Sequence, residues 1–364
     1  MKRNLEKKVW IYSVTLMVIG LIALYSASYN NVRVEHKIFF DQLKFASIAI
    51  LVMAFLGKTD YRRFYDGAYV FYLLNIFLLI AVLVMGRHAL GAKRWINLGE
   101  LSFQPSEFMK LALILALARY FSKRRVQLSF NFLSRTQLLI RDLIYPLFLT
   151  LIPMAFIFKQ PDLGTALLLF GIFFVMIFSG GLEYKYIFSL IGLCVGSFPF
   201  AWHFLKQYQK DRLLVFLNPN IDPLGAGYTI IQSKIAMGSG QLLGKGWLAG
   251  TQNQLNFLPE RHTDFIFSVI GEEWGLVGTL VVVLVYFLLI QSLLDIASQT
   301  KDRFGIFVCM GIAAILTWQV IINVGLVIGM FPIVGITLPF ISYGRSSFLV
   351  TALMLGFVLN LTRR

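Results

Sequence analysis

Long apolar runs recur along nearly the whole chain, and they constrain the fold more than any other feature. A run of about 17–25 apolar residues, wound as an α-helix, spans a hydrocarbon core about 30 Å thick. Transmembrane strands would alternate apolar and polar side chains, whereas residues 73–85 (LLNIFLLIAVLVM) are apolar at nearly every position. The sequence therefore predicts an all-α integral membrane protein. The ten expected spans are 9–27, 39–56, 67–86, 105–121, 142–158, 163–180, 186–204, 265–290, 305–328 and 346–361.

Composition agrees with a membrane protein and indicates a single domain. Hydrophobic residues make up 58% of the chain and charged residues only 14%, which is outside the range of soluble globular proteins. No internal repeat, low-complexity region or linker divides the sequence, so we expect one polytopic membrane domain over residues 1–364. Its exceptional part is the connection 205–264 between the seventh and eighth spans, because connections of that length are usually functional.

The distribution of basic residues predicts the orientation. With a cytoplasmic N-terminus, short connections on one side hold 17 of the 33 basic residues, as the positive-inside rule favours, and ten spans return the C-terminus to that side. The connection 205–264 then lies outside. Topology and contact with anionic membrane lipids explain the net charge of +15, and no soluble domain with interleaved basic and aromatic residues suggests a nucleic-acid partner. The basic segments are 2–8, 58–63, 123–141, 185, 301–303 and 363–364.

Glycine is concentrated in one part of the long connection. Residues 225–250 contain seven glycines around a short helix expected at 228–237. These glycines serve either as interfacial turns or to let the backbone approach a ligand closely. A Walker-type phosphate loop is excluded, because Lys245 is followed by Gly246 where that motif requires Ser or Thr.

Two polar stretches mark the loop-side ends of the fourth and sixth spans. Glu107 and Lys110 lie three residues apart on one helix face inside a span. Ionisable residues there indicate a functional site, although a structural ion pair is the alternative. Asp162 precedes the sixth span, where the simpler interpretation is a helix cap and the other is a ligand.

The stretch 257–275 (FLPERHTDFIFSVIGEEWG) is the most polar point at which the chain enters the membrane. Arg261, His262 and Asp264 cluster there. In a partly dry site the pKa of a carboxyl rises, which suits a general base, while a nearby arginine lowers it. The alternatives are an N-terminal cap for Asp264 and an interfacial belt for the two basic residues. Glu272 and Glu273 follow two turns later and receive no assignment.

The last polar stretch, 329–348, contains prolines at 332 and 339 at membrane depth. Non-helical backbone is tolerated there only when protein buries it or when it lines a cavity. We therefore expect a re-entrant segment beside a site.

Several cations on the loop side suggest an anionic, lipid-linked substrate such as a polyprenyl diphosphate. The histidines lack metal-ligand spacing, and no Ser/His/Asp arrangement is recognisable. The candidate cations for diphosphate binding are Arg94, Arg212, Lys234, Lys245 and Arg345, with Lys110 and Arg261 as further candidates for the leaving group.

Five motifs, taken together, resemble the SEDS (shape, elongation, division and sporulation) family, and its elongation branch more than its division branch. The resemblance implies a ten-span peptidoglycan glycosyltransferase that polymerises lipid II on the outer face of the cytoplasmic membrane. It also implies a class B penicillin-binding protein and the elongation machinery as partners. The motifs are GAKRWINLG with FQPSEFMK (91–110), KQPDLGTA (159–166), NPNIDPLGAGYTIIQSKIAMGSGQLLGKGW (218–247), FLPERHTDFIFSVIGEEWGLVG (257–278) and FPIVGITLPFISYG (331–344).

The resemblance assigns roles to particular residues. The essential aspartate of the family matches Asp264. The family usually reads SYGGSS near its end, whereas Arg345 replaces a glycine here, which puts the family's local conformation in doubt and adds a charge. The other matched positions are Glu107, Lys110, Asp162, Arg261 and His262.

The mechanism expected from the resemblance is a single displacement with inversion. Asp264 takes the proton of the acceptor's 4-hydroxyl, whose oxygen attacks the anomeric carbon of the donor. Cations or a divalent ion, Mg²⁺ or Mn²⁺, meet the departing diphosphate. The competing functions are a lipid II flippase, which needs a polar path to the cytoplasmic face, and a non-catalytic scaffold of the elongation machinery.

Overall fold

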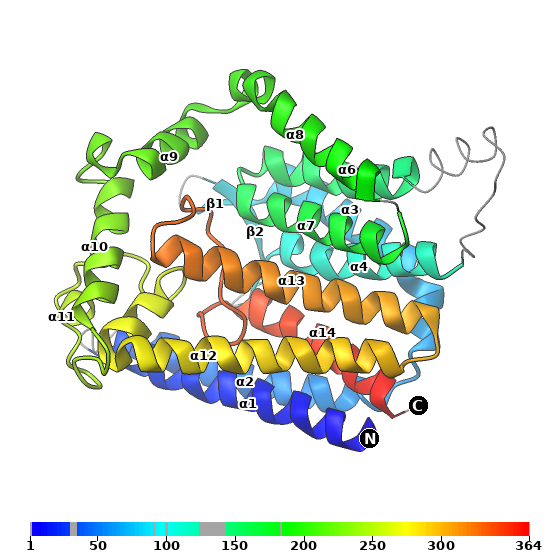
Figure 1. Cartoon of the computed structure of the whole chain (residues 1–364), viewed down its shortest axis with the longest axis horizontal. Helices are drawn as coiled ribbons and strands as arrows, with labels where there is room; N and C mark the ends of the chain where they lie inside the picture. Colours follow the sequence, from blue (N-terminus) through cyan, green and yellow to red (C-terminus); the bar gives the residue numbers. More distant parts are fainter. Residues whose placement is uncertain are drawn as a thin grey trace.

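The protein is a bundle of long helices in a computed structural model that describes residues 2–29, 35–89, 92–98, 101–123, 143–182 and 184–363 (Figure 1). Within these residues each expected span corresponds to one helix, and the predicted all-α membrane fold is confirmed. Residues 91, 99, 124–142 and 364, which belong to the motifs, spans and basic segments named above, lie outside the described part. The helices are α1 (Lys2–Ala27), α2 (Glu35–Leu56), α3 (Arg62–Met85), α4 (Pro105–Ser122), α6 (Tyr145–Lys159), α7 (Leu163–Ser179), α8 (Tyr184–Phe204), α12 (Ile266–Gln299), α13 (Arg303–Val327) and α14 (Arg345–Thr362).

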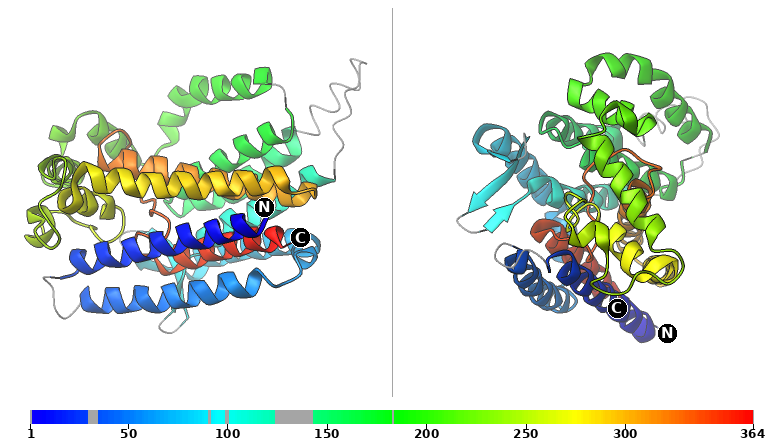
Figure 2. Two further views of the ribbon diagram at one scale, coloured as in Figure 1. Left: turned by 60° about the horizontal axis from the view of Figure 1, so that its bottom comes forward. Right: turned by 90° about the vertical axis from the view of Figure 1, so that its left-hand side faces the viewer.

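The helices form a bundle whose two ends differ. Both chain termini lie at one end, and the segments of the long connection lie at the other (Figures 1 and 2). Helix α1 packs on α12, α2 packs on α14, and α13 lies against α4, α7 and α12. Helix α8 stands at the edge of the bundle beside α7 (Figure 2). Ten expected membrane crossings would return the C-terminus to the side of the N-terminus, and this agrees with the two termini lying at one end of the bundle.

Charged residues distinguish α4 from the six long apolar helices of the described part. In the described part, six helices (α1, α2, α3, α12, α13 and α14) are long and apolar enough to cross a membrane. Helix α4 carries the charged residues Glu107, Lys110 and Arg119 in 18 residues, yet nearly all its side chains are buried. Because protein surrounds α4, its charges meet other side chains in place of lipid.

The long connection is largely helical. Helices α9 (Gln207–Leu217), α10 (Ala226–Ser239) and α11 (Thr251–Gln254) occupy it, together with a 3₁₀-helix at Pro219–Ile221. The helix expected at 228–237 lies inside α10. Ser233 of α10 is fully buried and donates to the carbonyl of Val327 at 2.8 Å, so α10 packs onto the head of the bundle.

A small antiparallel sheet joins α3 to α4, and the sequence pattern did not predict it. Its strands are β1 (Arg87–Ala89), β2 (Ala92–Leu98) and β3 (Leu101–Phe103), in the order β1-β2-β3. In the second pairing Ile96 lies opposite Phe103. Strands β1 and β3 have only three residues, which is too short to show a period, and the seven residues of β2 (AKRWINL) do not alternate between apolar and polar. The sheet brings Arg94 over the loop end of the bundle.

Glycine allows two backbones to pair at a break in α12. Gly275 adopts φ 66° and ψ −163°, which interrupts the helix. There the backbones of 241–246 and 272–277 exchange four hydrogen bonds of 2.9, 3.0, 2.9 and 3.1 Å. A Cβ at Gly244, whose φ is +81°, would overlap the carbonyl of Glu273. The glycines of this stretch therefore allow the backbone of the long connection to contact the backbone of α12 closely.

The connection between α13 and α14 is non-helical and buried, as predicted for the proline-containing stretch. Ile336, Leu338 and Ile341 are at most 3% exposed. Side chains satisfy backbone carbonyls of this segment, because Tyr286 donates to Pro339 and Asn323 donates to Ile336 at 2.8 Å. The segment thus meets the condition for irregular backbone at membrane depth.

Candidate active site

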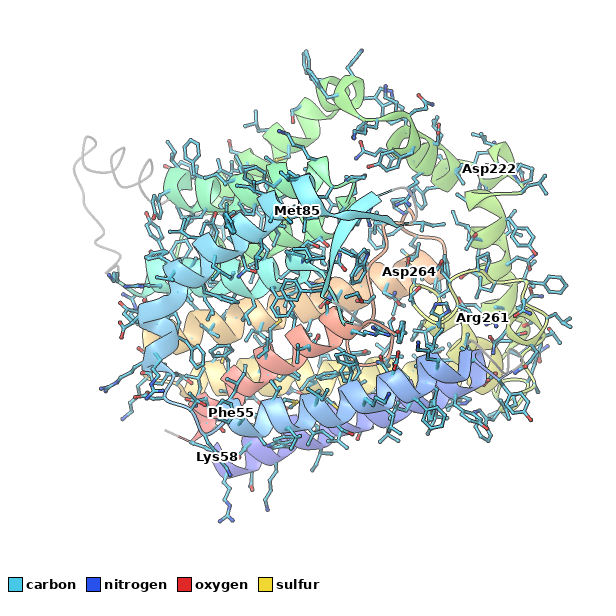
Figure 3. All side chains as sticks on the ribbon, turned by 180° about the vertical axis from the view of Figure 1, so that it is seen from behind. Phe55, Lys58, Met85, Asp222, Arg261 and Asp264 are labelled. Atoms are coloured by element: carbon cyan, nitrogen blue, oxygen red, sulfur yellow. The ribbon has the colours of Figure 1, made fainter. Side chains whose placement is uncertain are left out.

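A cavity of about 440 Å³ opens at the loop end of the bundle. Its walls come from β2, the first turn of α4, α9, the turn 259–265, the segment 333–337 and the start of α14. These elements are far apart in the sequence, and they meet because the long connection folds back over the helix ends. Figure 3 shows Asp264 on the inner side of this region and Arg261 nearer the periphery.

Asp264 lines the cavity and is partly exposed to it. Among the described residues no donor is hydrogen-bonded to its carboxylate. The cap of α12 is Phe265, which makes no side-chain capping bond, so Asp264 does not cap this helix. Burial raises the pKa of Asp264 to about 6, with a further increase from Glu260 and a decrease from Arg212 and Arg94. A carboxylate with that pKa is mostly ionised at neutral pH and can accept a proton.

Two arginines line the same cavity, and backbone carbonyls hold both. Arg94 of β2 donates from Nε to Gln160 O at 3.0 Å and also donates to Pro161 O. Arg212 of α9 donates from Nη1 to Ile333 O at 3.1 Å. A guanidinium has five N–H donors, so each arginine keeps donors for an anion after these bonds. The cavity therefore places the Asp264 carboxylate beside a positively charged wall.

Glu107 and Lys110 form an ion pair at the cavity wall. Lys110 Nζ lies 2.7 Å from Glu107 Oε2, and the lysine is only 2% exposed. Glu107 lines the cavity, whereas Lys110 lies behind it. The pair thus neutralises two charges inside the bundle, as the structural interpretation requires, and Glu107 forms part of the cavity wall. A functional role for the pair stays a prediction.

Asp162 caps α7, which confirms the simpler interpretation of this residue. Its carboxylate accepts from the backbone N–H of Thr165 at 3.2 Å and from the Thr165 hydroxyl at 2.9 Å. The Ser106 hydroxyl also donates to it at 3.2 Å. Asp162 does not line the cavity. It joins the first turns of α4 and α7, which places Glu107 and the cavity wall.

Arg345 lines the cavity and pairs with an aspartate that the sequence did not single out. Its Nη2 lies 2.5 Å from Asp41 Oδ2 on α2. Arg345 is the first residue of α14, where helical backbone angles suit any residue. The replacement of glycine by arginine is therefore free of backbone strain, and its consequence is the added charge.

Arg261 and His262 lie beside the cavity without lining it. Arg261 is 6% exposed, donates to Ala27 O at 2.7 Å and contacts Asn256, which anchors the turn 259–265 to α1. The His262 ring packs near Tyr343, with ring centroids 6.1 Å apart. The structure therefore gives both residues positions that support the turn.

Lys234 and Lys245 lie away from the cavity. Lys234 is exposed on α10, and Lys245 forms an ion pair of 2.8 Å with Glu272. Glu272 also accepts from the backbone N–H of Gln252 at 3.0 Å, while Glu273 accepts from Ser26 of α1. The two adjacent glutamates thus hold the long connection and α1 to the head of α12.

Sequence reasoning missed several residues of this region. Trp95, Thr229 and Tyr343 line the cavity, and Asn323 of α13 supports it from behind. Only Asn323 had a usable signal, because an amide inside an apolar span needs a partner there. The other residues become recognisable only when the separate segments meet.

In the described part of the chain, no group of three or more His, Cys, Asp or Glu side chains is arranged to hold a metal ion. Three acidic residues of the described part line the cavity: Asp264, Glu260 and Glu107. The carboxylate of Glu107 forms an ion pair with Lys110. These residues do not form a protein-only metal site. The divalent cation remains a prediction from the family resemblance.

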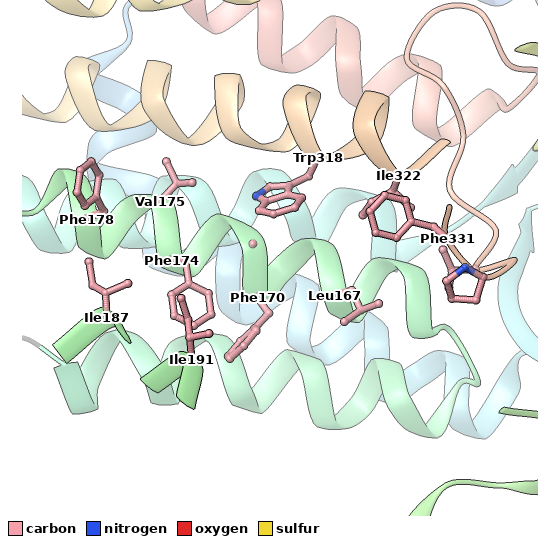
Figure 4. A pocket seen from close by; sticks show the side chains of 13 residues that line it. Leu167, Phe170, Phe174, Val175, Phe178, Ile187, Ile191, Trp318, Ile322 and Phe331 are labelled. Carbon is pink, nitrogen blue, oxygen red and sulfur yellow. The ribbon is translucent and has the colours of Figure 1, made fainter. Parts of the chain in front are cut away.

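An apolar groove of about 550 Å³ adjoins the cavity between α7, α8 and α13 (Figure 4). The cavity and the groove share the extended segment before α14. Phe331, Pro332 and Val334 line the groove, whereas Ile333 and Gly335 line the cavity. One wall therefore separates a charged compartment from an apolar one.

Comparisons with known proteins agree over nearly the whole chain. The family model of the cell cycle proteins FtsW, RodA and SpoVE matches residues 6–364. The peptidoglycan glycosyltransferase MrdB of Escherichia coli (strain K12) is 40% identical over 365 residues, covering 99% of this chain and 94% of that protein. The peptidoglycan glycosyltransferase RodA of Treponema pallidum (strain Nichols) is 31% identical over 422 residues, covering 96% and 95%.

Solved structures have the same fold. The crystal structure of the rod shape determining protein RodA of Thermus thermophilus is 30% identical, with a TM-score of 0.71, and 98% of this chain matches 95% of that one. A structure described as the coordination of polymerization and crosslinking by a peptidoglycan synthase complex has a TM-score of 0.80 at 31% identity, covering 98% and 96%. The resemblance inferred from the motifs is confirmed, and the chain belongs to the FtsW/RodA/SpoVE family of cell cycle proteins.

Proposed function

We propose that this protein is a peptidoglycan glycosyltransferase that polymerises lipid II into glycan strands during cell elongation. The observation that carries the proposal is the cavity in which the Asp264 carboxylate, free of hydrogen bonds from the described residues, shares a space with Arg94 and Arg212. The related proteins of Escherichia coli and Treponema pallidum are named for the same activity.

In the proposed reaction Asp264 acts as the general base. Its carboxylate takes the proton of the acceptor's 4-hydroxyl while that oxygen bonds to the anomeric carbon of the donor. The bond from that carbon to the diphosphate breaks, and the lipid diphosphate leaves with the electron pair. The donor bond is α and the product bond is β, so one displacement with inversion suffices. Arg94, Arg212 and Arg345 are the cavity cations that can stabilise the leaving diphosphate.

The adjoining groove supports an amphipathic substrate. Lipid II joins a charged diphosphate and sugars to a long polyprenyl chain. The cavity provides guanidinium groups, and the groove provides an apolar surface on the other side of the segment 331–335. We propose that the head group enters the cavity and that the chain lies along the groove. A divalent cation, Mg²⁺ or Mn²⁺, would supply further charge stabilisation to the diphosphate.

The proposed location is the cytoplasmic (inner) membrane, with both termini in the cytoplasm and the cavity on the outer face. The positive-inside pattern of the connections supports this orientation. We also propose a class B penicillin-binding protein as partner, because the solved peptidoglycan synthase complex couples polymerization to crosslinking in a homologous chain. Other elongation proteins would then meet the same assembly.

The location of the cavity favours an enzyme over a flippase. The membrane helices α4 and α14 contribute only residues of their first turns, and the remaining lining comes from loop-end segments. A translocation path requires polar lining that continues toward the opposite end.

The test is polymerisation of lipid II by the purified protein with its penicillin-binding partner. We expect Asp264→Asn to abolish glycan synthesis, because the amide cannot accept the proton. The matched control is Asp222→Asn, an acid-to-amide change in the same connection. Asp222 accepts from the N–H of Ala226, the first residue of α10, at 2.8 Å and does not line the cavity. Substantial glycan synthesis by folded Asp264→Asn would refute the assignment of the base.

A further inference from the structure

We propose that Asn323 is the positioning residue for Asp264. This inference rests on the proposed function, since it assumes that Asp264 is the base. Asn323 lies in α13, is fully buried and does not line the cavity. It therefore cannot touch the substrate and must act through its neighbours.

The side-chain amide of Asn323 joins two walls of the cavity. Its Nδ2 donates to the backbone carbonyl of Asp264 at 3.0 Å and to that of Ile336 at 2.8 Å. Asp264 precedes α12, and Ile336 lies in the extended segment whose residues Ile333 and Gly335 line the cavity. One amide group therefore ties the backbone of the base directly to the segment that forms another wall of the cavity.

The neighbouring carbonyls of the turn are held in the same way. Ser342 Oγ donates to Thr263 O at 2.6 Å, and the N–H of Tyr343 donates to His262 O at 2.9 Å. Three consecutive carbonyls thus receive hydrogen bonds from α13 and from the segment before α14. Asn323 holds the one that belongs to the base itself.

The buried side chain of Asn323 has an energetic cost that an apolar side chain at this position would avoid. Its Oδ1 is buried and has no hydrogen-bond partner among the described residues. A buried polar atom without a partner is destabilising, and an apolar residue of the same shape would avoid this cost. The two bonds that Nδ2 makes are therefore what an amide provides here and leucine cannot.

The test measures kcat and KM for lipid II polymerisation, together with thermal unfolding, in the complex with its partner. Asn323→Leu removes both hydrogen bonds and keeps the number and branching of the side-chain heavy atoms. We expect kcat to fall about 10–100-fold with KM within about twofold of wild type, because small displacements of a catalytic group are costly. Asn323→Asp should be intermediate, since a buried carboxyl is protonated and donates to only one of the two carbonyls.

The control is Gln319→Leu, which replaces a buried amide one turn earlier on α13 and should keep normal kcat. If folded Asn323→Leu stays within threefold of wild type while Asp264→Asn is inactive, the inference is wrong and the proposed function stands. A fall in kcat that merely parallels a loss of thermal stability in every variant also overturns it. If Asn323→Leu does not fold, the same criteria apply to Asn323→Asp. An active Asp264→Asn would instead refute the assignment of the base, and a wild-type protein that makes no glycan with its partner would show that the proposed function fails.

Discussion

The pH dependence of the reaction offers the sharpest test of how the cavity tunes its base. The pKa of Asp264 is about 6 against an ordinary value of 3.8, mainly because of burial. The difference of about two pH units corresponds to about 3 kcal/mol against the ionised form. A general base works only when deprotonated, so activity is present above this pKa and falls as the pH drops through it.

The expected rates follow from the ionised fraction. With a pKa of about 6, roughly nine tenths of Asp264 is ionised at pH 7 and roughly one tenth at pH 5. We therefore expect kcat/KM to be about tenfold lower at pH 5 than at pH 7. An aspartate at the ordinary value would remain almost fully ionised at pH 5, and the rate would hardly change.

Mutation of Glu260 tests this pKa, because the charge of Glu260 is the second-largest cause, next to burial, of the raised pKa of Asp264. Glu260 is about half exposed, with 49% of its side chain accessible, so the interaction is worth about 0.2–1 kcal/mol. Glu260→Gln should then lower the pKa by about 0.2–0.7 pH units and raise the rate at pH 5 up to about fourfold. High salt should shrink the effect.

The assay is the initial rate of lipid II polymerisation at low substrate concentration from pH 4.5 to 8, with activity restored at pH 7 after each exposure. Asp211→Asn is the control, since it removes an exposed carboxylate from α9 that is not among the charges acting on Asp264. The reasoning fails if the wild-type rate at pH 5 stays within twofold of that at pH 7. It also fails if Glu260→Gln raises the pKa of the acidic limb in the pH–rate profile.

Two further predictions concern stability. Asp162→Ala removes the cap of α7 and leaves Thr165 without its partner, so thermal unfolding should show a loss of about 1–2 kcal/mol; an unchanged midpoint would contradict the capping role. Gly244→Ala should destabilise by about 1–3 kcal/mol, because φ is +81° and the added Cβ meets the Glu273 carbonyl. Gly238→Ala, in α10 with open space around its Cβ, is the matched control and should be neutral or slightly stabilising. Equal effects of the two alanines would refute the close-packing argument.

Much of the fold could be read from local patterns. Apolar runs located each long helix of the described part, because hydrophobic length is a property of contiguous residues. The helix ends were less accurate: α12 continues to Gln299, nine residues beyond its expected limit at 290, since the apolar pattern ends at the lipid boundary while the helix does not. The sheet between α3 and α4 escaped prediction for a related reason, because its short strands show no period.

The chemical character of the site was also visible in the sequence. Asp264 sits where a long polar connection enters an apolar helix, and its motif matches the family's essential aspartate. Asp162 precedes a helix with the spacing of a cap, and it is one. Such signals survive without tertiary information because they depend on neighbours within a few residues.

The partners of each charge depended on tertiary structure alone. All the candidate cations looked alike in the sequence, yet Arg94, Arg212 and Arg345 line the cavity, whereas Lys245 is held by Glu272 and Arg261 by the end of α1. Local sequence sets helix length, period and caps, but an ion pair or a cavity wall forms where elements far apart in the chain pack together. The sequence therefore singled out Asp264 by its motif, and the packing of the bundle decided which cations line the cavity with it and which side chain bonds to its backbone.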